Sequence, residues 1–143
     1  MKVEGSHTIP APRERVWELL NDPDVLARCT PGVSKMEAER EGFYRATLQL
    51  SIGPVKGRFE GHMEVTDSRE PEAMTLTIEG SGAPGGVRAV GHITLEQEGE
   101  QTVVSYHGQP QISGRLAAVG ARLLSGVAKK LAGQFFNRLS EES

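Results

Sequence analysis

The periodicity of apolar residues changes near residue 33, and this change constrains the fold more than any other feature of the chain. From residue 33 to 112, apolar and polar residues alternate with a period of two, which is typical of strands with one buried face. Residues 114–139 contain no proline and carry apolar residues at three- and four-residue steps, as in an amphipathic helix. Because a sheet with one apolar face must be covered, we expect this long helix to cover it.

Turn signals divide the alternating region into six predicted strands. These signals are Gly42, Gly53-Pro54, Glu70-Pro71, Ala83-Pro84-Gly85-Gly86 and Glu98-Gly99-Glu100. Short connections of this kind join antiparallel neighbours, so we expect a meander. The predicted strands are 33–40, 43–52, 55–66, 73–81, 87–97 and 102–112.

Before residue 33, the chain predicts one strand, over residues 1–9, and two short helices. A stripe of apolar residues from Val16 to Leu20 indicates a helix over about 12–20. Asp22 is predicted to cap a second helix, over about 23–28, and Pro23 takes its first position. The predicted fold class is therefore α+β, in one domain of residues 1–143. A curved antiparallel sheet of about seven strands, with two short helices after strand 1, wraps around a long C-terminal helix.

Composition narrows the classes of protein. A chain of 143 residues fits one domain, and no apolar run approaches the roughly 20 residues that span a bilayer. The polar N-terminus shows no apolar signal region, so we expect a cytoplasmic protein, with peripheral contact to the inner face of the cell membrane left open. A net charge of −3 argues against a nucleic-acid partner. With Cys29 as the single cysteine, neither an internal disulfide nor a cysteine-based zinc site is expected.

Small residues recur on the predicted inner face of the sheet, among them Gly57, Gly61, Gly80, Gly91 and Gly108. They indicate either a sharply curved sheet or a curved sheet with an unfilled pocket. Three glycines of the long helix (Gly120, Gly126 and Gly133) indicate that a strand, a ligand or another helix approaches its backbone.

We therefore predict a pocket for an apolar molecule such as a lipid, a quinone or a sterol-like ring. The alternative is a filled core in a pure interaction module, with a homodimer left open. The residues predicted to line the pocket are Leu48, Leu50, Phe59, Met63, Met74, Leu76, Ile93, Tyr106, Leu123, Val127 and Leu131.

Residues with catalytic or metal-binding chemistry are few. The four histidines are His7, His62, His92 and His107; none lies at helical metal-ligand spacing from another, and His62 and His92 are predicted to face outward. His7 and His107 would meet only through strand pairing. We expect no metal, no cofactor and no enzymatic activity.

An alternative is a cyclase- or hydratase-like enzyme. It would require Tyr44, Tyr106 and His107 or Cys29 to converge inside the pocket. Cys29 alone is more typical of a small buried residue.

The predicted C-terminal helix carries a basic stripe. Arg115, Arg122 and Lys129 recur every seven residues, with Lys130 and Arg138 nearby. The stripe indicates either a solvated face or a surface for anionic lipid headgroups.

Three segments together resemble the CoxG family of carbon monoxide dehydrogenase subunits over essentially the whole chain. They are Asn21-Asp22-Pro23 with Leu26 and Cys29-Thr30-Pro31-Gly32; Gly53-Pro54-Val55-Lys56-Gly57 with Phe59 and Gly61; and Gly114-Arg115-Leu116-Ala117 with Gly120 and Phe135-Phe136. Thr30 departs from the isoleucine common in that family.

The resemblance implies a START-like, Bet v 1-type helix-grip fold. It also implies a non-enzymatic accessory role near molybdenum hydroxylases, docking such enzymes to the membrane or linking them to quinone.

Overall fold

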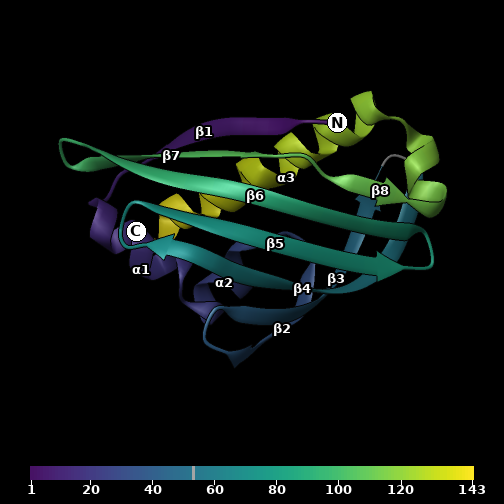
Figure 1. The fold of residues 1–143 in the computed structure, drawn as a ribbon, viewed down its shortest axis with the longest axis horizontal. Coiled ribbons are helices and arrows are strands. Elements are labelled where there is room, and N and C mark those ends of the chain that lie inside the picture. The colour runs from purple at the N-terminus through teal and green to yellow at the C-terminus, as the bar shows by residue number, and fades with distance from the viewer. Residues whose placement is uncertain (53) are drawn as a thin grey trace.

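The fold is a long antiparallel sheet with three α-helices (Figure 1). The computed structural model describes residues 1–52 and 54–143. Its elements are β1 (Val3–Ile9), α1 (Arg13–Leu20), α2 (Pro23–Cys29), β2 (Val33–Arg40), β3 (Phe43–Ile52), β4 (Val55–Arg69), β5 (Ala73–Gly82), β6 (Gly85–Glu98), β7 (Gln101–Gly108), β8 (Gln111–Ser113), the 3₁₀ helix η1 (Gly114–Val119) and α3 (Ala121–Glu142).

The strands follow the order β1-β7-β6-β5-β4-β3-β2, and every neighbouring pair is antiparallel. Strands β2 to β7 are therefore a meander, as the turn signals predict, and β1 returns beside β7. The α+β class, the two short helices and the sheet are confirmed. The predicted turn at Gly53-Pro54 lies partly outside the described residues.

One predicted strand, 102–112, is two strands in the structure. β7 ends at Gly108, and β8 pairs instead with the beginning of β6. Pro110 lies between them, and proline has no backbone N–H for a ladder hydrogen bond. The strand therefore breaks at this residue.

The prediction of one continuous helix over 114–139 is wrong. Residues 114–119 form η1, and α3 begins only after Gly120, whose φ of 98° lies in the left-handed region that favours glycine. The break changes which residues face inward. Leu116 on η1 is fully buried, whereas Leu123 in the first turn of α3 is 45% exposed.

The helices cover one face and one end of the sheet. In Figure 1, α3 passes behind β6, and it lies against β1 and α2. Asp22 caps α2 as predicted, because its Oδ1 accepts a hydrogen bond from the backbone N–H of Asp24 at 2.9 Å. An ion pair between Arg28 and Glu142, with Nη2 to Oε1 at 2.6 Å, joins α2 to the end of α3.

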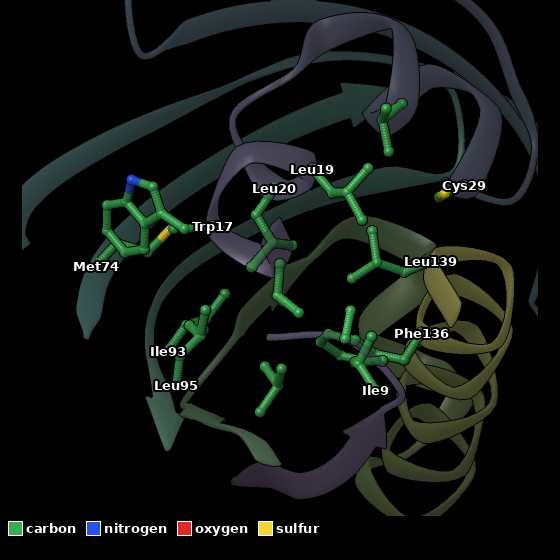
Figure 2. Close-up of a cluster of buried hydrophobic side chains, with 14 residues drawn as sticks. Ile9, Trp17, Leu19, Leu20, Cys29, Met74, Ile93, Leu95, Phe136 and Leu139 are labelled. Atoms are coloured by element: carbon green, nitrogen blue, oxygen red, sulfur yellow. The ribbon is translucent and has the colours of Figure 1, made fainter. Parts of the chain in front are cut away.

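Two clusters of buried side chains form the core. The larger one packs α1, α2 and the C-terminal half of α3 on β1 and β5–β7, and includes Ile9, Trp17, Leu20, Phe136 and Leu139 (Figure 2). The smaller one joins the other end of α3 to β3, β4 and η1 through Ile52, Phe59, Leu116 and Leu124. Burial of each large apolar side chain contributes about 1.5–3 kcal/mol, so the two clusters hold both ends of α3 on the sheet.

Candidate functional site

A cavity of about 450 Å³ lies between the sheet and α3. Its lining includes members of both core clusters, such as Phe59 from the smaller and Met74 from the larger, so it occupies the space between them. Nine of the eleven residues predicted to line a pocket do line it: Leu48, Leu50, Phe59, Met63, Met74, Leu76, Ile93, Tyr106 and Leu131.

Two of the predicted lining residues, Leu123 and Val127, do not line the cavity. The side chain of Leu123 is exposed, and Val127 packs against the smaller core cluster. Their prediction assumed an unbroken helix from residue 114, and the break at Gly120 shifts the inward face of α3 away from Leu123. Only the C-terminal half of α3, around Leu131 and Phe135, lines the cavity.

Part of the lining was not predicted. Leu20, Leu26 and Met36 close the end of the cavity nearest α1 and α2, and Phe135 and Phe136 contribute from α3. Leu20 and Phe135 were recognised as apolar positions of helices, but periodicity does not say what a helix covers. The placement of α1 and α2 over the sheet was the missing information.

The inner-face glycines serve two different purposes. A Cβ on Gly61 would collide with the carbonyl oxygen of Glu79 and lie 2.8 Å from the Cα of Gly80, so close approach of the strands requires glycine there. At Gly80 and Gly91 the nearest atoms would be 3.9 and 3.8 Å from a Cβ, which is ordinary contact. Gly80 and Gly91 line the cavity, so the sheet is curved and also leaves space.

The glycines of α3 do not behave as expected from the sequence. Within residues 1–52 and 54–143, no atom lies within 4 Å of a Cβ built on Gly126 or Gly133, leaving out each residue's chain neighbours and the nearby backbone of α3. No strand or second helix of this chain therefore approaches the backbone there. Gly120 instead provides the positive φ that separates η1 from α3.

One end of the cavity is aromatic. The ring of Phe136 stacks on that of His7, with centroids 4.6 Å apart, and the Tyr106 ring is nearly parallel to both. Burial lowers the pKa of His7 and raises the pKa of Tyr106. Both side chains are therefore uncharged near neutral pH, which suits a cavity without ions.

The residues required by the enzyme alternative do not all meet. The rings of Tyr44 and Tyr106 line the cavity, and burial followed by the nearby charges of Asp22 and Glu41 raises the pKa of Tyr44. Cys29 is fully buried in the larger core cluster, where burial raises the pKa of its thiol. His107 is exposed, and only its backbone neighbourhood borders the cavity.

A larger depression, of about 890 Å³, lies on the outer face of the sheet. Its charged residues pair with one another, as Arg88 Nε does with Glu79 Oε1 at 3.2 Å and Lys35 Nζ with Glu37 Oε1 at 3.2 Å. With acids and bases already paired, it offers no single sign of charge to a ligand. The apolar cavity is the better candidate site.

Neither of two further site types is found in the part of the chain that the structure describes. There, no three histidine, cysteine, aspartate or glutamate side chains are grouped as metal ligands. No described helix combines the length and the apolar character that crossing a bilayer requires.

The solved structures similar to this chain share its fold. A conserved protein from Geobacillus kaustophilus is 37% identical, with a TM-score of 0.95 over 99% of this chain and 94% of that one. A START superfamily protein from Mycobacterium smegmatis is 11% identical, with a TM-score of 0.78 over 99% and 95%. An aromatase/cyclase from Streptomyces sp. R1128 is 18% identical, with a TM-score of 0.69 over 99% and 92%. No curated protein matches significantly.

The family model of the carbon monoxide dehydrogenase subunit CoxG matches residues 5–143. That range contains the sheet, all three α-helices and the whole cavity lining except Val3. With a START-like fold and this match, the chain belongs to the CoxG family of carbon monoxide dehydrogenase subunits.

Proposed function

We propose that this protein binds an apolar small molecule, a lipid or a quinone, in the cavity between the sheet and α3, and that it does so without catalysing a reaction. The observation that carries the proposal is the cavity itself: about 450 Å³, within the range of small-molecule sites, and lined almost entirely by apolar side chains. A hollow of this kind lowers the stability of the empty protein, since unfilled volume forfeits packing. A bound apolar ligand would restore these contacts.

The cavity lining also supports a carrier over an enzyme. Of the polar residues that the enzyme alternative needs, Cys29 is packed in the core and His107 lies at the exposed surface. Tyr44 and Tyr106 remain as neutral hydroxyls that can each donate one hydrogen bond to a ligand oxygen. Such groups orient a ligand in an apolar pocket.

Extraction of the purified protein tests this proposal directly. Organic extracts analysed by mass spectrometry should contain a lipid or quinone in an amount comparable to the protein, and menaquinone added to delipidated protein should raise its melting temperature. An extract without such a molecule, together with an unchanged melting temperature for lipids and quinones, would argue for the interaction module instead.

We also propose that the protein contacts the anionic face of a membrane through the basic stripe. No acidic residue occurs between Glu100 and Glu141, a stretch that carries Arg115, Arg122, Lys129, Lys130 and Arg138. Each basic side chain near an anionic surface contributes about 1 kcal/mol. Vesicles containing anionic phosphatidylglycerol should therefore bind the protein at low salt, and neutral phosphatidylcholine vesicles should not. Equal binding to both would refute the electrostatic contact.

A third part of the proposal concerns the partner, and it rests on family membership alone. We propose an accessory role beside a molybdenum hydroxylase of the carbon monoxide dehydrogenase type, linking it to the membrane or to quinone. Neighbouring genes for molybdopterin-, FAD- and iron–sulfur-binding subunits would support this role, and co-elution of the purified proteins would test it. Separate elution at micromolar concentrations would argue against a stable complex.

A further inference from the structure

Two histidines lie side by side on the outer face of the sheet, away from the cavity. His92 on β6 and His107 on β7 are directly opposite each other in the antiparallel register, and both are exposed. Their ring centroids are 4.9 Å apart and their planes are inclined by 35°. Two like side chains in this position repel each other when both are protonated, so the pair gains nothing as a pair of cations.

The neighbouring strand β5 orients one of the two rings. Thr75 is the register partner of His92, and its Oγ1 lies 3.3 Å from His92 Nδ1. In the tautomer whose Nδ1–H donates to Thr75, the lone pair of Nε2 is free. A hydrogen bond to the second ring nitrogen is the usual arrangement around a histidine that binds a metal.

The spacing of the rings fits two ligands of one ion. With metal–nitrogen distances of about 2.0–2.1 Å and angles of about 90–109°, two imidazoles on the same ion hold their centroids about 4.5–5.2 Å apart. The observed 4.9 Å lies inside this interval. The strand register therefore holds the two rings at the required separation before any ion binds.

We propose that His92 and His107 together bind one divalent transition-metal ion such as Zn²⁺. Imidazole nitrogen suits zinc, copper and nickel, whereas Mg²⁺ prefers oxygen ligands. The site has two protein ligands, and water completes the coordination. Glu4, the register partner of His107 on β1, is paired with Lys2 at 3.5 Å, and no group of three metal-binding side chains exists among the described residues. Binding is therefore micromolar rather than nanomolar.

The site is independent of the cavity, since it lies on the opposite face of β6 and β7. An ion there would tie these two strands together through their side chains. Protons compete with metal for the imidazole nitrogens, so binding weakens at acidic pH.

Calorimetric titration of the untagged, full-length chain with Zn²⁺ at pH 7.5 tests the proposal. We expect one saturable site per chain with micromolar affinity, at least tenfold weaker in His92→Gln and in His107→Gln. Thr75→Val should weaken it less, and MgCl₂ should produce no binding. His62→Gln is the matched control: His62 faces outward on the same sheet but stacks on Phe43 rather than on a second histidine, and its loss should leave the affinity unchanged.

A second measurement keeps the result independent of the stability of the variants. Zn²⁺ should perturb the imidazole resonances of His92 and His107 in the wild-type protein before those of His7 and His62. No saturable binding up to millimolar Zn²⁺, or an affinity equal to wild type in His92→Gln, would overturn the proposal.

Discussion

Replacing Gly91 by valine should fill part of the cavity without moving the backbone. Gly91 lies on the inner face of β6, and the nearest atom to a Cβ there is the carbonyl oxygen of His107, at 3.8 Å. Its φ is not in the left-handed region, so a β-branched residue fits the strand. The new side chain therefore projects into the cavity that Gly91 lines.

The expected gain in stability follows from the volume that is filled. A valine side chain adds about 80 Å³, and at about 24 cal/mol per Å³ of cavity this gives an upper limit of about 2 kcal/mol. For a chain of this length, about 2–4 °C per kcal/mol converts the limit into a rise of about 4–8 °C in melting temperature. The same substitution removes nearly a fifth of a cavity of about 450 Å³. We therefore expect a cavity-bound apolar probe to bind at least tenfold more weakly.

Thermal melting of delipidated protein, followed by titration with a fluorescent fatty-acid analogue, measures both effects. Thr94→Val is the matched control because Thr94 is exposed on the same strand and faces away from the cavity. It should change neither quantity.

Gly61→Ala provides the contrast. Its Cβ would collide with the carbonyl of Glu79, so the strands must move apart, and we expect a loss of at least about 1–3 kcal/mol. If Gly91→Val destabilises the protein as much as Gly61→Ala, or leaves probe binding unchanged, the space beside Gly91 is not the binding site.

Three further predictions concern the core and the α2–α3 contact. Leu139→Ala should cost about 2–5 kcal/mol in urea denaturation because Leu139 is fully buried, whereas Leu123→Ala, at a 45% exposed position, should stay within about 0.5 kcal/mol; similar losses would contradict the inward face assigned to α3. Cys29 is fully buried with a raised pKa, so a thiol reagent at pH 8 should label native protein far more slowly than urea-unfolded protein, and equal rates would show that α2 opens readily. Hydrogen bonds from Arg28 lower the pKa of Glu142 from 4.5, so this pair stabilises the fold above about pH 4.5 and ceases to do so as the pH falls through the lowered value. Glu142→Gln should therefore be less stable than wild type at pH 7, and the difference should vanish near pH 2–3; a difference independent of pH would mean that charge is not its source.

The strands were predictable because their information is local. Alternation and turn residues placed β2 and β3 at the bounds that the structure has, and Asp22 with Pro23 marked the start of α2. The same alternation assigned the inner face of each strand, which is why nine of the eleven expected residues line the cavity. Side-chain direction in a strand follows from parity alone.

The errors occurred where backbone conformation depended on single residues. Gly120 adopts a positive φ, and this divides the C-terminal segment into η1 and α3. The apolar spacing across the break still fitted one helix, so periodicity alone could not detect it. Leu123 was therefore assigned to the cavity and is exposed instead.

The sequence by itself determined the strand and helix types, their order, the inner face of the sheet and the family, because these depend on local periodicity and short motifs. Only the tertiary structure decided that α3 lies against β1 and α2 while a cavity remains between it and the middle of the sheet. It also distinguished Gly61, which close strand approach requires, from Gly91, which leaves space. Whether a small residue marks a bend or a void depends on atoms from distant strands, and these are brought together only by folding.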